Sequence, residues 1–408
     1  MKRTLTLTLS IAALLLAAFG GGTSAQQQFG GAQLAVPEIP FDSVPNFLKL
    51  PDGLYLGEVP GVATNSKGHV FVYSRTGTTT ATLGGSRVFT HGGSRLFEFD
   101  DKGAFVREIG VGIYGFLFAH VVRIDPQDNI WVVDEGANLV MKFDPNGRIL
   151  MTIGRKPESI NVRNYEPPAP PAGPAGRGGA AAGGREGGAG GGRGGQQAAA
   201  SPVVGAGVAG ESFNRPTDVG WDAQGNIFVS DGYGNSRVAK YDKNGVFLKM
   251  AGHRGAGPLE FNTPHGLAMD AAGNVYIADR GNNRIQVLDN DLNFKAAYDQ
   301  VGNPWAVCVS GGPGPKNPGK QYLYVSNSWP DSAPAAQAEY TGEVYKMELD
   351  GTIVGKFGKG GKAPGEFSTI HQMDCRDPNT IFTAEINNWR SQKIQLKPQA
   401  GSSRTSAN

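Results

Sequence analysis

The chain has 408 residues with 38 basic and 36 acidic side chains, which gives a formal net charge of +2. Without Lys2 and Arg3, which lie in a signal-like N-terminus, this charge falls to about zero. The sequence contains neither a basic patch nor an acidic block, which argues against nucleic acid or a charged surface as a partner. We expect a small-molecule or peptide substrate and a monomeric protein.

The N-terminal residues 1–25 have the pattern of a signal peptide. Two cations precede the apolar run 11–19, and small residues lead up to a cleavage point before Gln26. The apolar run is too short to span a bilayer comfortably. We therefore predict export, with a secreted or periplasmic mature protein that has no membrane span. Residues 26–53 are expected to form a lead-in to the fold.

Two copies of one sequence pattern stand side by side between residues 213 and 288. Thr217 lies 14 positions before Asp231 in the first copy, and His265 lies 14 positions before Asp279 in the second. Within each copy a Gly-Asn turn separates runs of alternating apolar residues, which is typical of short strands. The spacing of the copies indicates a repeat of about 48 residues.

Extending the pattern along the chain gives six copies. His120 lies 14 positions before Asp134, and His371 lies 14 positions before a glutamate. The first copy has Ser74 in place of the acid, and the fifth copy is longer and more degenerate. Each copy has four short strands, and repeats of this kind are typical of closed β-propeller blades, which leave no free sheet edge. We therefore predict an all-β, six-bladed propeller over residues 54–397, with a stacked solenoid as the alternative.

Two segments have compositions that cannot support a packed core. Residues 164–209 consist almost entirely of Gly, Ala, Pro, Gln and Arg, so we predict a disordered insertion between the second and third blades. The tail at 398–408 is expected to be disordered as well.

The chain has two cysteines, Cys308 and Cys375, in the fifth and sixth blades. An exported chain can join such a pair in a disulfide, but the sequence does not show whether the two residues meet. Both lie in apolar strand contexts, where a free cysteine behaves as a small buried hydrophobe. We therefore expect two free thiols.

We call the acidic residue that ends each repeat pattern, such as Asp134 or Asp279, the blade acid. Histidine occupies the position 14 residues before the blade acid in blades two, four and six, as His120, His265 and His371. The innermost strand of each blade lines the channel of a propeller, so these three residues would stand about 120° apart and converge. A single histidine at a strand end is more often structural. Three of them at one repeat position favour a metal site, and three imidazoles without a fourth protein ligand are typical of catalytic zinc.

Two further side chains are expected near the same point. Tyr233 follows Asp231 by two positions, and Arg75 lies in the matching loop of blade one. A tyrosine beside a metal ion and a guanidinium can act as a base, and the arginine can hold a substrate carboxylate or carbonyl. Without the histidines, a packing role for Tyr233 and an ion pair for Arg75 would be the simpler interpretation.

The repeats resemble NHL repeats, and the stretches PTDV, VSDGYGNSR, PHGLA and ADRGNNRIQ resemble the peptidyl-α-hydroxyglycine α-amidating lyase family. The similarity covers about residues 57–396 apart from the insertion, and DGYGNSR is its specific motif. The resemblance implies that the three histidines bind zinc. It also implies that Tyr233 deprotonates the α-hydroxyl of a carbinolamide while Arg75 orients the substrate, releasing an amide and glyoxylate.

The chain departs from that family around its third histidine and after its tyrosine. The family has Met-Pro-His-Asp where this chain has Thr369, Ile370, His371 and Gln372. The resemblance implies that the missing aspartate binds a structural Ca²⁺ ion. Gln372 is therefore only a candidate calcium ligand, through its side-chain carbonyl. The family's cysteine after the tyrosine is Gly234 here, so the corresponding disulfide is absent.

These observations predict an exported zinc-dependent lyase that acts on a peptidyl-α-hydroxyglycine-like carbinolamide. A zinc-dependent lactone or ester hydrolase is an alternative, because an open zinc site with a nearby base also activates water. A non-catalytic propeller that binds protein or glycan is a further alternative. Five polar residues are expected to converge on the channel, and a propeller that only binds a partner has no need for three histidines, a tyrosine and an arginine there. This argues against the non-catalytic alternative.

Overall fold

The computed structural model describes residues 36–77, 81–83, 87–89, 92–155, 212–311, 319–329 and 341–397. The predicted signal peptide, the insertion at 164–209 and the tail at 398–408 lie outside these described residues. No helix within the described ranges is long and apolar enough to cross a membrane.

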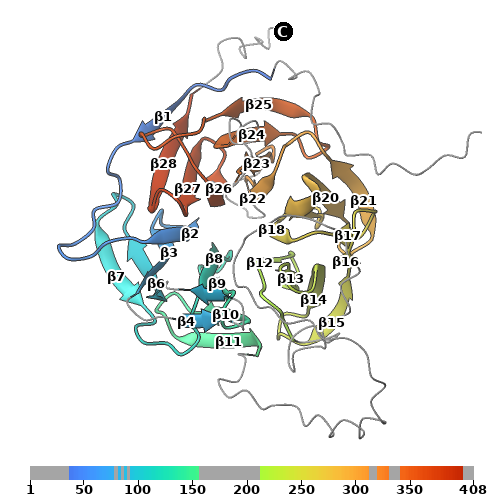
Figure 1. The fold of residues 1–408 in the computed structure, drawn as a ribbon, viewed down its shortest axis with the longest axis horizontal. Helices are drawn as coiled ribbons and strands as arrows, with labels where there is room; N and C mark the ends of the chain where they lie inside the picture. Colours follow the sequence, from blue (N-terminus) through green and yellow to red (C-terminus); the bar gives the residue numbers. More distant parts are fainter. Residues whose placement is uncertain are drawn as a thin grey trace, which may run out of the picture. The chain divides into compact units, whose positions relative to one another are not determined.

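Six four-stranded antiparallel sheets are arranged as the blades of a ring (Figure 1). From the innermost strand outwards, blade one consists of β2 (Glu58–Thr64), β3 (Val70–Gly77), β6 (Gly92–Phe99) and β7 (Phe105–Ile109). Blade two consists of β8 (Ala119–Ile124), β9 (Ile130–Asp134), β10 (Leu139–Phe143) and β11 (Ile149–Gly154). Blade three consists of β12 (Asp218–Trp221), β13 (Ile227–Asp231), β14 (Arg237–Tyr241) and β15 (Phe247–Ala251).

The remaining three blades repeat this order. Blade four consists of β18 (Pro264–Met269), β19 (Val275–Asp279), β20 (Arg284–Leu288) and β21 (Phe294–Tyr298). Blade five consists of β22 (Pro304–Val309), β23 (Leu323–Asn327), β24 (Glu343–Met347) and β25 (Ile353–Phe357). Blade six consists of β26 (Ile370–Asp377), β27 (Thr380–Glu385), β28 (Arg390–Leu396) and β1 (Phe41–Val44). The described chain also contains two small pairs and a 3₁₀ turn: β4 (Ala81–Leu83) with β5 (Arg87–Phe89), β16 (His253–Arg254) with β17 (Glu260–Phe261), and η1 (Arg280–Asn282).

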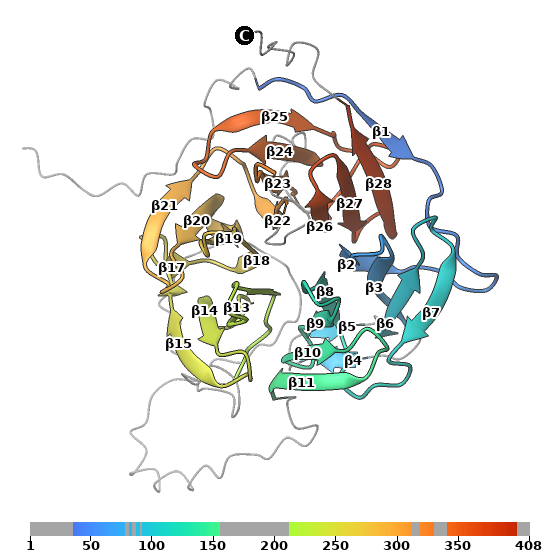
Figure 2. The ribbon, with the colours of Figure 1, turned by 180° about the vertical axis from the view of Figure 1, so that it is seen from behind.

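The ring is closed by β1, which forms the outer strand of the last blade (Figures 1 and 2). Its residues pair antiparallel with β28, from Phe41 opposite Leu396 to Val44 opposite Lys393. Part of the predicted lead-in therefore belongs to the propeller. The closed ring confirms the predicted six-bladed propeller and excludes the stacked solenoid.

The hydrophobic core is divided into six layers, one at each junction between neighbouring blades. Strand β13 shows the cause, because successive side chains of a strand point to opposite faces. Its Phe228 packs in one layer with Leu267 of blade four, and its Val229 packs in another with Val133 of blade two. Both faces of the strand are buried, whereas apolar–polar alternation is typical of a strand with one buried face.

Cys308 and Cys375 form a disulfide, so the prediction of free thiols was wrong. The two residues lie on the innermost strands β22 and β26, and their Cα atoms are 6.2 Å apart. Each does lie in an apolar context, since both belong to the core layer between blades five and six. The strand contexts were therefore recognised correctly, but the pairing depends on how two neighbouring blades align.

Candidate metal centre

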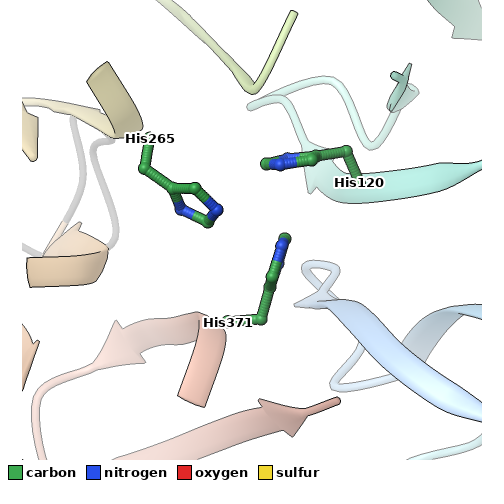
Figure 3. A group of neighbouring side chains, drawn as sticks. All are labelled: His120, His265 and His371. Atoms are coloured by element: carbon green, nitrogen blue, oxygen red, sulfur yellow. The ribbon is translucent and has the colours of Figure 1, made fainter. Parts of the chain in front are cut away.

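Three histidines point to a common space at the centre of the ring (Figure 3). His120, His265 and His371 lie on the innermost strands of blades two, four and six. The centroids of their rings are 4.5 to 4.8 Å apart, and their ligand atoms lie within 4.8 Å of one another. All three are buried. The structure thus brings together the three residues that the repeat spacing singled out.

The backbone of each innermost strand explains why these side chains face the channel. At each histidine the pairing register shifts, so the histidine itself is skipped in the ladder to the next strand. A β-bulge of this kind re-aims a side chain. The blade acid stabilises the approach to the bulge: Asp134 accepts hydrogen bonds from the Leu117 and Phe118 amides, at 2.8 and 2.9 Å. In blade four Asp279 accepts one from the Asn262 amide, at 2.7 Å.

The hydrogen bonds of the imidazoles leave ring nitrogens free for a metal. His265 Nδ1 lies 2.9 Å from the Trp305 carbonyl, and His371 Nδ1 lies 2.9 Å from the Pro60 carbonyl. Since a carbonyl only accepts, Nδ1 carries the proton and Nε2 keeps its lone pair. Among the described residues, His265 Nε2 and both ring nitrogens of His120 are buried without a hydrogen-bond partner. Such orphaned nitrogens are costly unless a further group binds them, and the donor set fits a zinc ion.

The electrostatic surroundings keep the three imidazoles neutral. Burial lowers the pKa of each histidine well below its usual value. Charge repulsion acts in the same direction: a proton on His371 would disfavour one on His120, and the guanidinium groups of Arg280 and Arg75 lower the pKa of His265 and His371, respectively. Neutral imidazole is the form that binds a metal.

The structure places both predicted catalytic side chains beside the histidines. The Tyr233 ring follows β13, with its centroid 5.7 Å from that of His120 and 6.0 Å from that of His265. Arg75 of β3 donates from Nε to the Ala119 carbonyl, at 2.8 Å, next to His120. Its Nη1 donates to Glu58, also at 2.8 Å. Arg75 is therefore held rigidly, and part of its donor capacity is already used.

Three residues at the site were not singled out from the sequence. Arg280 lies 4.2 Å above the Trp305 ring, and its Nη1 is buried without a partner among the described residues. The Trp305 ring is 4.9 Å from that of His265. Glu135 is buried, with Oε2 3.9 Å from His120 Nε2. A signal was present for two of them, because Arg280 and Glu135, like Arg75, directly follow the position of the blade acid.

The surroundings of Gln372 do not fit a calcium ion. Its Oε1 accepts hydrogen bonds from the Val62 and Val122 amides, at 3.1 and 3.2 Å. Its Nε2 donates to the Val122 carbonyl, at 2.6 Å. Calcium binds oxygen ligands, whereas this position already presents N–H donors that satisfy the side-chain carbonyl. The carboxamide thus links β26 to the innermost strands of blades one and two.

Comparison with known proteins supports the resemblance drawn from the sequence. The NHL repeat family model matches residues 261–288. A probable peptidyl-α-hydroxyglycine α-amidating lyase of Caenorhabditis elegans is 27% identical over 216 residues, covering 47% of this chain and 43% of that protein. A peptidyl-α-hydroxyglycine α-amidating lyase of Drosophila melanogaster is 24% identical over 140 residues, covering 34% of this chain and 17% of that protein. The matched regions thus span less than half of either relative.

Solved propeller structures also align with the chain at low identity. A streptogramin B lyase is 12% identical, with a TM-score of 0.47, over 88% of this chain and 98% of its own. A gluconolactonase from Xanthomonas campestris is 13% identical, with a TM-score of 0.48, over 90% of this chain and 99% of its own. The similarity to amidating lyases therefore rests on the sequence matches, not on these structures.

Proposed function

We propose that this protein is an exported zinc-dependent lyase that cleaves a peptidyl-α-hydroxyglycine-like carbinolamide to an amide and glyoxylate. The observation that carries this proposal is the convergence of three buried histidines, two of which lie beside the Tyr233 ring. Partial similarity to amidating lyases supports the reaction class. The disulfide supports export, because such bonds persist in oxidising compartments.

His120, His265 and His371 would hold the zinc ion, each through a ring nitrogen that faces the common space. When bound, zinc supplies a Lewis acid with an open position for a substrate oxygen. Tyr233, acting as its phenolate, accepts the proton of the α-hydroxyl. The hydroxyl oxygen then becomes the aldehyde oxygen of glyoxylate as the bond from the α-carbon to nitrogen breaks. The electron pair of that bond goes to the amide nitrogen, to which the tyrosine can return the proton.

Two arginines can bind the carboxylate of such a substrate. Arg75 was the predicted orienting residue, but it already donates to Glu58 and to a backbone carbonyl. Arg280 has a buried Nη1 without a partner among the described residues, and its guanidinium lies over Trp305. We therefore assign the carboxylate to Arg280, with Arg75 supplying positive charge near His371.

Glu135 favours a second candidate function, a zinc-dependent lactone or ester hydrolase. Its carboxylate is buried at the edge of the histidine cluster, 3.9 Å from His120 Nε2. A carboxylate in this position could orient and deprotonate a water molecule for attack on a carbonyl, and a zinc ion held by the three histidines would supply Lewis acidity. The lyase remains the first candidate because the sequence matches are to lyases.

The first test is the metal content of the purified mature protein, with His265→Ala beside it. We expect about one zinc per wild-type chain and loss of that zinc in the variant, because three protein ligands define the site. The wild type should then release glyoxylate from α-hydroxyhippurate. Tyr233→Phe should retain zinc but lower kcat by roughly 10²- to 10⁴-fold, the usual contribution of a general base.

Assays on simple lactones and esters with the same zinc-loaded samples separate the two candidate enzymes. Hydrolysis without glyoxylate release would establish the second candidate in place of the first. Absence of zinc from both samples, even after incubation with the metal, would overturn both enzyme proposals and leave a binding propeller.

A further inference from the structure

An ion pair beside Tyr233 has no part in the lyase reaction proposed above. Glu135 accepts a hydrogen bond from Arg215 Nε, at 2.7 Å, and a second one from Arg215 Nη2. Both bonds go to Oε1, whereas Oε2 faces His120. The Glu135 side chain is 2% exposed and the Arg215 side chain 39% exposed. The pair therefore runs from the buried histidine cluster to the surface, across the junction of blades two and three.

The same guanidinium packs on the Tyr233 ring, with Cζ 4.3 Å from the ring centroid. A cation at this distance over an aromatic face is attracted by the ring. Arg280 approaches the Tyr233 ring at 5.3 Å. The position of the phenol is thus set by two guanidinium groups, and Glu135 holds one of them in place.

The backbone around Arg215 is built to hold this arrangement. Arg215 has a φ of 61°, in the left-handed region that is uncommon for non-glycine residues, and Thr263 has a similar φ at the equivalent position of blade four. Its amide donates to Asn138 Oδ1, at 2.8 Å, and its carbonyl faces the Tyr233 amide, at 3.4 Å. Asn138 belongs to the same turn of blade two as Glu135. One turn of blade two therefore fixes both the backbone and the side chain of Arg215.

The segment that carries Arg215 also contacts the loop that carries Tyr233. The Gly234 amide donates to the Asn214 carbonyl, at 3.0 Å. A Cβ atom at Gly234 would lie 2.1 Å from the Asn214 side chain, so the two segments are in contact. Residues 214 and 215 thus contact the tyrosine loop without a covalent bond.

We infer that Glu135 and Arg215 form a positioning clamp for Tyr233, which holds the phenol over the histidine centre. This inference rests on the proposed function, in which Tyr233 transfers the proton. The clamp acts through Tyr233 and not on the substrate, so its loss lowers kcat and leaves KM nearly unchanged. A misplacement of about 1 Å can cost about 100-fold in rate, so the effect is large although no reacting atom is removed.

The kinetic test compares Glu135→Gln, Arg215→Gln and the double variant, all loaded with zinc. We expect each single change to lower kcat about 10- to 100-fold with KM within about threefold. The double variant should be no slower than the worse single variant, because both changes break one unit. Arg215→Lys, which keeps the charge but replaces the planar guanidinium with a single ammonium group, should recover part of the activity. Losses that multiply in the double variant, or that appear only in KM, would overturn the clamp.

Arg95→Gln is the matched control. Arg95 forms a similar ion pair with Glu108, its side chain is 35% exposed, and its guanidinium lies 4.9 Å from the Phe97 centroid. This variant should unfold at a temperature similar to that of Arg215→Gln but keep wild-type kcat. An equal loss of kcat in both variants would show a general effect on stability and contradict the clamp.

A second measurement does not depend on enzyme activity. With 3-fluorotyrosine at position 233, ¹⁹F NMR should show one sharp resonance for the wild type, and shifted or broadened resonances for Glu135→Gln and Arg215→Gln. An unchanged spectrum in both variants would overturn the clamp even if the protein is a lyase. If the wild type lacks lyase activity but the spectrum responds as expected, the clamp stands and the proposed function fails.

Discussion

At the scale of single residues, Arg280 is the side chain to which we assign the substrate carboxylate. Its Nη1 is buried without a partner among the described residues, and its guanidinium packs on Trp305. Removing its charge by Arg280→Gln should raise KM for a carboxylate-bearing carbinolamide about 10- to 100-fold, since a hydrogen bond to a charged group contributes about 1.5–3 kcal/mol. The analogue with a carboxamide in place of the carboxylate should change little. Steady-state kinetics on both substrates measures the difference.

The control for this prediction is Arg254→Gln, which removes an exposed arginine of β16. It should leave both KM values unchanged. An equal rise in KM for the two substrates in Arg280→Gln would contradict carboxylate recognition and indicate a general disturbance of the pocket.

The histidines could be predicted because one bulge recurs at the same place in the repeat, and a fixed backbone gives a fixed sequence spacing. Arg280 and Glu135 share a repeat position with Arg75 and could have been found in the same way. The side chains that they contact could not be predicted. That Arg280 packs on Trp305 depends on the alignment of blade four with the degenerate blade five, which no local pattern specifies.

At the scale of elements, the identity of the strand that closes the ring was beyond the sequence pattern. Strand β1 has only four residues and matches no repeat, yet it pairs with β28 near the other end of the chain. The disulfide between Cys308 and Cys375 is a similar case, since it joins two strands that the repeat places in different blades. Local alternation predicts that a strand exists, but it does not name a distant partner.

Closure by β1 predicts a measurable contribution to stability. The Phe41 ring packs against Phe357 and Phe367, with centroids 5.5 and 6.5 Å away. Phe41→Ala should lower the free energy of unfolding by about 2 kcal/mol, below the range for fully buried phenylalanine because this ring is only partly buried. Urea unfolding measures the change. Phe294→Ala, on the outer strand β21 of blade four, should cost less than about 1 kcal/mol. Equal losses in the two variants would contradict a special role of the closing strand.

At the scale of the whole molecule, two side chains connect all six blades around the channel. Gln372 of blade six bonds to Val62 of blade one and to Val122 of blade two. Arg123 of blade two binds Asp218 of blade three and donates to the Leu267 and Val307 carbonyls of blades four and five, at 3.0 and 3.3 Å. The hydrogen bonds of these two side chains therefore reach the innermost strands of all six blades. The repeat predicted a closed ring, but these links use positions that vary between blades.

These links predict that the propeller is stable without calcium. After removal of divalent ions and reloading with zinc, added CaCl₂ should leave the thermal midpoint unchanged, because the Gln372 carboxamide already satisfies the Val62 and Val122 groups. If a calcium ion bound the folded protein, a free Ca²⁺ concentration of 100 times its Kd would instead stabilise the fold by about 2.7 kcal/mol. Gln372→Ala should lower stability by roughly 1–3 kcal/mol, since it leaves buried amides unpaired. A calcium-dependent rise in the midpoint that disappears in Gln372→Ala would show that an ion binds here after all.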